Sequence, residues 1–232
     1  MEPHPHTLRA FDKERDELRA LISQMGGYAE SALREALRCL MQRDLDGAAR
    51  IVEQDHRLDE METEAEERAL QLIALRAPMA DDLREAVAAL KISGVVERIG
   101  DYAKNIAKRV PQLDRPGEIE PISLLPEMAR IAADLVHDAL DAFVERDAAK
   151  ATQVCANDRI VDDFYNSLFR ALLTYMMENP HNIGPATHLL FVAKNIERIG
   201  DHATNIAEMV YFAATGERLA ERLRGSSPIE AQ

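Results

Sequence analysis

Tryptophan is absent from this 232-residue sequence, and aromatic residues amount to only 5% of it. Glycine and proline are also scarce, with ten of each, and they gather at a few boundaries. A β-rich fold needs turn residues at short, regular intervals, so this distribution argues against one. Only two cysteines occur, Cys39 and Cys155. We expect both to be buried thiols, because nothing in the sequence requires an oxidising compartment.

An excess of positive charge is missing as well. The formal net charge is −13, so the electrostatic footprint of a nucleic-acid-binding protein is absent and adsorption to an anionic lipid surface is disfavoured. No apolar run approaches the roughly 20 residues of a membrane span. The N-terminal residues lack the basic and then apolar pattern of a signal peptide. We therefore expect a cytoplasmic protein that binds no nucleic acid and does not insert directly into a membrane.

Helix-forming residues dominate what is present. Ala, Leu, Glu and Arg are abundant, and these side chains lose little freedom in a helix. Apolar residues recur with helical periodicity almost from end to end, interrupted by short polar or proline-bearing segments. The periodicity predicts six long helices, near 7–42, 45–75, 79–110, 122–145, 148–178 and 182–215.

One stretch of sequence occurs twice. Residues 96–110 read VERIGDYAKNIAKRV and residues 196–210 read IERIGDHATNIAEMV, and ten of the fourteen residues from Glu97 to Val110 recur unchanged. Weaker matches extend the duplication upstream at a spacing of 103 residues, so the first half holds three extra residues before its third helix. Prolines at 111–121 mark a boundary that we expect to be free of helix.

The duplication predicts an all-α fold of two tandem, sequence-related three-helix bundles that meet near 111–121. The expected parts are a first repeat (1–112), a linker (113–120), a second repeat (121–216) and a polar C-terminal tail (217–232).

Apolar residues of the duplicated helix alternate at spacings of four and three, which is typical of a helix buried in a bundle. We expect each repeat to bury this apolar seam. It comprises Ile92, Val96, Ile99, Ala103, Ile106 and Val110 in the first repeat, and Val192, Ile196, Ile199, Ala203, Ile206 and Val210 in the second.

A polar stripe runs along the same two helices. Its members are spaced four apart, so they stack on one face, which at 100° per residue points roughly 180° away from the seam. Core packing cannot account for residues that point outward, so a matched stripe in both repeats favours a functional role over a solvated face. The stripe consists of Glu97, Asp101 and Asn105 in the first repeat, and of Glu197, Asp201 and Asn205 in the second.

The second predicted helix of each repeat adds two aspartates one turn apart, Asp55 with Asp59 and Asp158 with Asp162. Carboxylate oxygens are hard donors that suit iron, manganese, magnesium or calcium better than a thiolate-selecting metal. A bound cation would also relieve the repulsion between like charges one turn apart. The spacing leaves open whether the pairs on the second and third helices form one site.

In these motifs the sequence resembles the PhoU family, the accessory and regulatory proteins of bacterial phosphate transport. The resemblance covers nearly the whole chain, with D-x-x-x-D on the second helix and E-R-I-G-D-x-A-x-N-I-A on the third helix of each repeat. It implies six helices whose acidic motifs can hold multinuclear iron, or sometimes zinc, on the bundle surface, and the oxygen donors also suit manganese or magnesium. The candidate ligands are Asp55, Asp59, Glu97, Asp101, Asp158, Asp162, Glu197 and Asp201, with Asn105 and Asn205 as weaker candidates.

The resemblance also implies a role in phosphate homeostasis. A protein of this family couples a Pst-type phosphate ABC transporter, with its ATPase subunit, to a membrane sensor histidine kinase. It restrains phosphate uptake and phosphate-starvation genes when phosphate is plentiful, and it acts by binding partners without enzymatic turnover. We expect the same of this chain, and we expect it to form a homodimer.

Two alternatives come from other classes of protein. One is a helical scaffold or adaptor that binds no metal. The other is a di-iron carboxylate enzyme, which would need an inward-facing Glu-x-x-His on each of two helices. Glu53 and His56 have that spacing, but Ala156 and Arg159 stand at the matching positions of the second repeat.

A phosphotransfer histidine is a weaker hypothesis. His137 and His202 lie on predicted helices, but their counterparts in the other repeat are Arg34 and Tyr102. A single surface histidine without a repeated partner is more often incidental than functional.

Overall fold

The computed structural model describes residues 5–113 and 120–219, which form helices and short connections without any strand. The predicted all-α fold with six long helices is confirmed. They are α1 (Pro5–Gln42), α3 (His56–Arg76), α4 (Asp81–Ala107), α6 (Leu125–Glu145), α7 (Ala148–Glu178) and α8 (Ile183–Thr215). Shorter helices are α2 (Leu45–Gln54), α5 (Val110–Leu113), and the 3₁₀ helices η1 (Glu120–Leu124) and η2 (Pro180–Asn182).

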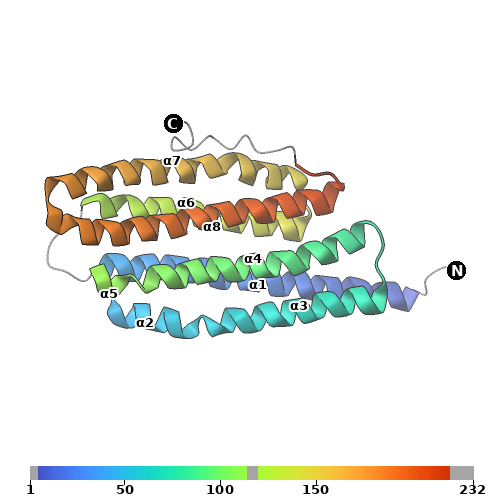
Figure 1. Cartoon of the computed structure of the whole chain (residues 1–232). Helices are drawn as coiled ribbons and strands as arrows, with labels where there is room; N and C mark the ends of the chain where they lie inside the picture. Colours follow the sequence, from blue (N-terminus) through green and yellow to red (C-terminus); the bar gives the residue numbers. More distant parts are fainter. Residues whose placement is uncertain (1–4, 114–119, 220–232) are drawn as a thin grey trace.

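The helix boundaries differ from the prediction at two places. The helix expected over 45–75 is divided at Asp55, whose backbone stays right-handed helical (φ −58°, ψ −37°), so α2 and α3 follow one another along the same side of the molecule (Figure 1). Pro111 was expected in a stretch without helix and lies instead in α5. A proline is tolerated there because the first turn of a helix needs no N–H from it.

Two predicted segments fall largely outside the described residues. Of the linker at 113–120, residues 114–119 are not described, and of the tail at 217–232, residues 220–232 are not described. Residues 217–219 carry no helix. The linker and the tail therefore stay predictions.

The first connection of each repeat uses the same turn. Arg43 and Arg146 adopt left-handed backbone conformations, with φ of 57° and 56°, and each ends the preceding helix. The next residue, Asp44 or Asp147, caps the following helix, because its Oδ1 accepts a hydrogen bond of 2.8 Å from a backbone N–H of the first turn. This turn explains why the Arg-Asp dipeptide occurs at equivalent places in the two repeats.

The two repeats lie side by side along their lengths. In Figure 1 the helices α1 to α4 form one half and α6 to α8 form the other, with α4 and α8 adjacent and antiparallel in the middle. Helix α1 also packs against α6. The bundles were expected to meet near 111–121, but their contact is far more extensive, because α4 and α8 each present apolar residues to both halves.

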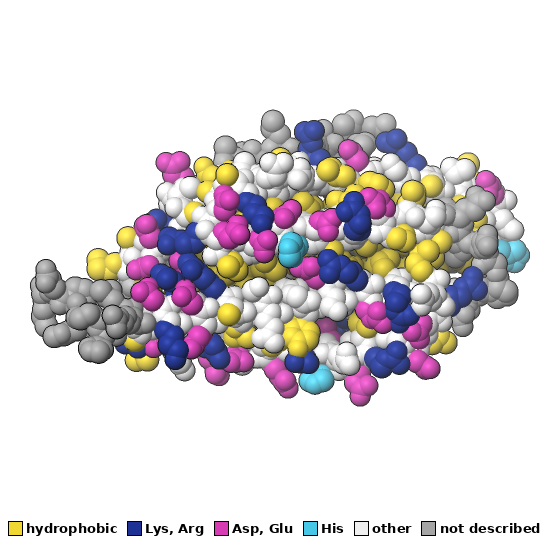
Figure 2. Space-filling model, turned by 180° about the vertical axis from the view of Figure 1, so that it is seen from behind, with side chains coloured by type: hydrophobic (Ala, Val, Ile, Leu, Met, Phe, Trp, Pro, Cys, Tyr) yellow, Lys and Arg dark blue, Asp and Glu magenta, His cyan; other side chains and the backbone are white. Residues whose placement is uncertain are grey.

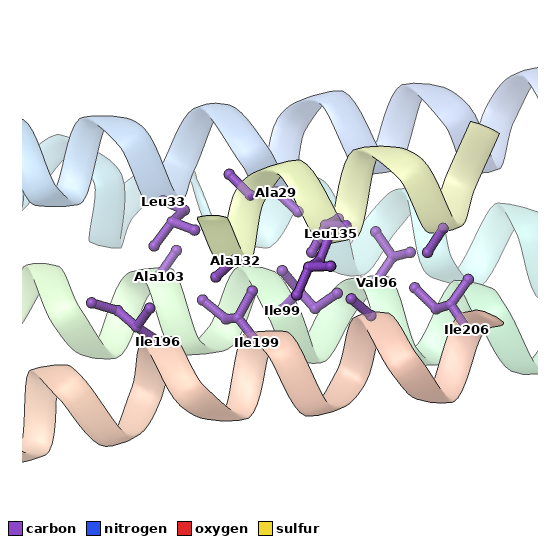
Figure 3. Close-up of a cluster of buried hydrophobic side chains, with 14 of the residues drawn as sticks. Ala29, Leu33, Val96, Ile99, Ala103, Ala132, Leu135, Ile196, Ile199 and Ile206 are labelled. Carbon is purple, nitrogen blue, oxygen red and sulfur yellow. The ribbon is translucent and has the colours of Figure 1, made fainter. Parts of the chain in front are cut away.

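A single hydrophobic core results from this arrangement. Ile99 and Ile199, like the other residues of the two predicted apolar seams, are at most 2% exposed, so the seams are confirmed. Figure 3 shows side chains from α1, α4, α6 and α8 meeting in the same cluster, among them Leu33 and Leu135. Burial of aliphatic side chains contributes about 25 cal/mol per Å² of apolar surface, so this shared core stabilises both repeats together.

The outer surface is charged and mixed. Figure 2, which shows the face opposite to that of Figure 1, has acidic and basic side chains interspersed over much of its area. On α6, for example, Arg130 forms ion pairs with Glu127 at 2.7 Å and with Asp134 at 2.6 Å. Within 5–113 and 120–219, no helix is both long and apolar enough to cross a membrane.

Candidate functional site

The acidic pairs of the first repeat converge between α3 and α4. Lys104 joins them, because its Nζ donates a hydrogen bond to Asp55 Oδ2 at 2.5 Å and another to Asp101 Oδ1. Asp55 stands at the start of α3, and Asp101 and Lys104 lie on successive turns of α4. The second- and third-helix motifs of this repeat therefore lie next to each other and share one lysine. We call Asp55, Asp59, Glu62, Glu97 and Asp101 the first acidic cluster.

Glu97, Asp101 and Asn105 of the stripe on α4 are half-buried, so the expectation that the stripe points away from all packing is wrong. The side chain of Asp101 is 40% exposed, whereas those of Asp55 and Lys104 are only 12% and 20% exposed. Helix α4 packs against α1, α3 and α8, so a face turned away from the seam still meets α3. A helical wheel gives the angle between two faces of one helix but does not show which neighbour covers each face.

Glu97 is the most perturbed acid of this cluster. Burial, together with the smaller contributions of the charges of Asp101, Glu62 and Asp59, raises the pKa of Glu97 to about 7 against the opposing effect of Lys104. Burial also raises the pKa of Glu62, with Asp59 among the charges that add to the effect. The first acidic cluster therefore gathers negative charge from both helices and holds part of it protonated near neutral pH.

The second repeat builds an equivalent cluster between α7 and α8. Asp158 is 5% exposed and the side chain of Glu197 is 14% exposed. Lys194 Nζ donates a hydrogen bond to Glu197 Oε1 at 2.6 Å. Burial raises the pKa of Glu197, and this effect is opposed by Lys194 and reinforced by the charges of Asp201 and Asp162. We call Asp158, Asp162, Glu197 and Asp201 the second acidic cluster.

Glycine in the repeated E-R-I-G-D motif lets the two helices of each cluster approach closely. A Cβ atom on Gly100 would lie 2.3 Å from Leu58 Cδ2. On Gly200 it would lie 3.1 Å from Asp158 Oδ1 and 3.5 Å from Val161 Cγ1. Leu58 and Val161 are repeat equivalents, so both glycines face the same position of the neighbouring helix, and only the contact at Gly100 is too tight for a Cβ atom.

Sequence reasoning missed three residues of the clusters, namely Glu62, Lys104 and Lys194. The two lysines occupy positions at which the repeats differ. Lys104 has Thr204 as its counterpart in the second repeat, and Lys194 has Gly94 as its counterpart in the first. Each repeat thus carries one lysine three residues from an acid of the stripe. Neither lysine recurs at the equivalent position of the other repeat, so a comparison of identical residues between the repeats does not identify them.

The candidate ligands have the type of donor atom that a hard cation prefers, because each offers a carboxylate or amide oxygen. Their present arrangement does not complete such a site. Over the described part of the chain, no group of three or more His, Cys, Asp or Glu side chains is placed to hold one metal ion. Lysine ammonium groups neutralise both clusters instead. Of the weaker candidates, Asn105 is half-buried and Asn205 is exposed.

The residues of the rival hypotheses lie elsewhere. Glu53 and His56 are both exposed, and His56 Nδ1 lies 2.7 Å from the carbonyl oxygen of Glu53. They do not provide the inward-facing pair that a di-iron enzyme would need. His202 is half-buried and its ring meets that of Tyr102 edge to face, with centroids 5.2 Å apart. The two repeat-equivalent positions thus pack against each other where α4 crosses α8.

These features define an internally duplicated helical protein in which each three-helix repeat carries an acidic cluster between its second and third helices. The chain belongs to the PhoU family, since the PhoU domain matches residues 22–110 and, a second time, residues 125–210.

Relatives with the same organisation cover almost the whole chain. The phosphate-specific transport system accessory protein PhoU homolog of Zymomonas mobilis is 53% identical over 98% of this chain and 96% of its own length. That of Caulobacter vibrioides is 48% identical over 94% of this chain and 95% of its own. The crystal structure of PhoU from Pseudomonas aeruginosa superposes with a TM-score of 0.81 at 34% identity, covering 89% of this chain and all of that one.

Proposed function

We propose that this protein regulates phosphate homeostasis as an accessory protein of a phosphate transport system. The observation that carries the proposal is the 53% identity to a phosphate-specific transport system accessory protein over 98% of the chain. Both acidic clusters lie within the two segments that match the PhoU domain. In this role the protein couples the ATPase subunit of a Pst-type ABC transporter to a membrane sensor histidine kinase, in the cytoplasm and as a homodimer.

Regulation of this kind proceeds by binding and needs no turnover. When phosphate is plentiful, the protein restrains uptake and the expression of phosphate-starvation genes. The test is complementation of bacteria that lack their own accessory protein and carry a phosphate-starvation reporter. Expression of this chain should restore repression in phosphate-rich medium. A reporter that stays fully active, with the protein present at normal abundance, would contradict the proposal.

Metal binding at the acidic clusters belongs to the same proposal. In the first repeat the ligands are Asp55, Asp59, Glu97 and Asp101, and a bound metal ion would supply a cross-link between the second and third helices. Lys104 must then release its two aspartates, and Glu97 must be deprotonated. Because the pKa of Glu97 is about 7, metal affinity should begin to fall below about pH 7. In the second repeat the ligands are Asp158, Asp162, Glu197 and Asp201.

Elemental analysis of untagged protein tests the metal sites. His4 and His6 are replaced in every sample, because histidines near the N-terminus bind metal adventitiously. Asp101→Asn combined with Asp201→Asn should remove most of the bound metal, whereas Lys104→Met should retain or increase it. Equal metal content in the parent and in the Asp101→Asn/Asp201→Asn variant would show that the clusters are not the principal sites.

A scaffold that binds no metal is the second candidate, and the lysines favour it. Lys104 and Lys194 already place a positive charge among the carboxylates, so the clusters can exist without metal. The elemental analysis also decides this question, because a parent protein that contains no metal at pH 8 after growth in iron-rich medium supports the scaffold.

A further inference from the structure

An open groove lies at one end of the contact between α4 and α8, away from both acidic clusters. It has a volume of about 260 Å³. Its walls are apolar, formed by Leu83 and Val87 of α4 and by Met209 and Phe212 of α8. Two cations, Arg84 and Lys91, complete its lining. Leu83 is 39% exposed and Phe212 is 41% exposed, so large apolar side chains of the groove face solvent.

The duplication supplies an internal comparison, because α4 and α8 are antiparallel and repeat-equivalent. At the other end of their contact the equivalent groove is filled. Arg109, the counterpart of Met209, stacks its guanidinium 4.6 Å from the ring centroid of Phe191, which is the counterpart of Lys91. The same guanidinium lies 3.5 Å from Nδ1 of His188. At one end of the contact between α4 and α8 the groove is thus filled by the stacked side chains of Arg109 and Phe191, whereas at the other end it is open.

Lys91 and Arg84 bring two cations to the open end, where Asp81 and Asp82 form the acidic first turn of α4. The whole chain has a net charge of −13. Lys91 is exposed and forms no ion pair with any residue of 5–113 or 120–219. Arg84 pairs with Asp81 at 2.7 Å, but its Nε is buried and donates to no acceptor among the described residues. The Nε atoms of Arg15 and Arg19 have the same status elsewhere in the structure, and at Arg84 a carboxylate that enters the groove could accept this hydrogen bond.

We propose that this groove binds a segment of a partner protein in which one or two apolar side chains are flanked by carboxylates. The apolar side chains would occupy the space between Val87 and Phe212. The carboxylates would meet Lys91 and the free N–H of Arg84. The inference goes beyond the proposed regulatory function, because the groove and its charges do not depend on metal or on phosphate.

Two other occupants fit the groove less well. Residues 220–232 of this chain contain two arginines and two glutamates and so offer no net negative charge to the groove. A second copy of the chain would need a stable interface of about 20–30 residues a side, and the groove is lined by seven. A short acidic segment matches both the size and the charge.

The probe is a fluorescein-labelled peptide with a central Leu-Phe pair between aspartates and glutamates, titrated against the full-length protein by fluorescence polarisation. We expect saturable binding below about 1 mM that weakens with added salt, because exposed charges are screened. Lys91→Glu and Phe212→Ser should each weaken binding about tenfold. A peptide with Asn and Gln in place of its acids should bind at least about tenfold more weakly. No binding of the acidic peptide, or equal binding of both peptides, would overturn the proposal.

The matched control is Arg170→Glu, which reverses an exposed cation on α7 away from the groove and should change affinity less than twofold. All variants should melt within a few degrees of the parent, so that a loss of binding reports the groove. Replacing Leu223 and Ile229 with Ser tests the chain's own tail. If that variant binds the peptide more than threefold more tightly, the tail is the occupant and the proposal is wrong. Conversion of a parent dimer to monomer by Lys91→Glu would assign the groove to a second copy and would likewise overturn it.

Discussion

The two acidic clusters occupy equivalent places in the two repeats but are neutralised in different ways. In the first, Lys104 of α4 bridges to Asp55 of α3 and to Asp101 of its own helix. In the second, Lys194 pairs with Glu197 three residues away on α8. The two lysines are not repeat equivalents. Each cluster therefore holds one ammonium group among its carboxylates, of which the first cluster has five and the second four, while the position that supplies the ammonium differs.

The residues around the two lysine positions also differ between the repeats. The first cluster contains Glu62, whose counterpart in the second repeat is Tyr165, and Lys194 lies 5.4 Å from the centroid of the Tyr165 ring. Gly94, the counterpart of Lys194, leaves room beside Glu62, because a Cβ there would lie 3.0 Å from Glu62 Oε1. The comparison shows that the two clusters share an ammonium group set among carboxylates, and that the residue which supplies it is exchangeable.

The largest expected effect tests whether the two repeats share one core. Ile99→Asp and Ile199→Asp each place a charge at a position with no exposed surface, and each should cost more than about 4 kcal/mol of unfolding free energy. Circular dichroism and soluble yield are the measurements. Ile199→Val, which costs about 1 kcal/mol, is the control. If one repeat stayed cooperatively folded while the other melted, the cores would be independent.

A smaller effect distinguishes the two lysines. Lys104→Met removes an ion-pair bridge between α3 and α4, and we expect a loss of about 1–2 kcal/mol at pH 8. Lys194→Met removes an ion pair within one helix and a weak cation–π contact with Tyr165 of α7, and the loss should be smaller, about 0.5–1 kcal/mol. Urea titration of metal-free protein measures both. Equal losses would mean that Lys104 does not stabilise the contact between its two helices.

The glycines of the repeated motif should also respond differently. Alanine at position 100 would bring a Cβ within 2.3 Å of Leu58, so the cost of overpacking exceeds the gain in helix propensity and Gly100→Ala should lose about 1 kcal/mol. Gly200→Ala meets Asp158 at 3.1 Å and should change stability by less than about 0.5 kcal/mol. Thermal unfolding of the two variants, each compared with the parent, measures the two changes in stability. A larger loss for Gly200→Ala than for Gly100→Ala would contradict the tighter contact at Gly100.

An effect of similar size to that of Gly100→Ala depends on pH and concerns the first acidic cluster. The pKa of Glu97 in the folded state is about 7, above its ordinary value of 4.5, so protonation favours folding. The stabilisation is fully present below pH 4.5 and is lost as the pH rises through 7. Glu97→Gln mimics the protonated acid. It should therefore be more stable than the parent by about 1 kcal/mol at pH 8 and equal to it at pH 4. A stability difference that does not change with pH would contradict the shifted pKa.

Much of the fold follows from the sequence, because apolar spacing fixes which face of a helix is buried. The seam through Ile99 and Ile199 and the helix α7 were predicted to the residue. The break at Asp55 was not, since the backbone there deviates only locally from a continuous helix. The burial of Glu197 was missed because it depends on how α7 packs beside α8. The lysines were missed because they lie where the two repeats differ.

The central claim is that the two acidic clusters carry the regulatory function. A variant that combines Glu97→Gln, Asp101→Asn, Glu197→Gln and Asp201→Asn tests it most directly. These changes remove the carboxylate charges, keep the shape of each side chain and leave the apolar seams intact, so the protein should fold and reach normal abundance by immunoblot.

The readout is the phosphate-starvation reporter in phosphate-rich medium, in cells that lack the wild-type protein. We predict that the parent represses the reporter and that the four-site variant at equal abundance does not. Full repression by the variant would show that these carboxylates are dispensable and would contradict the account.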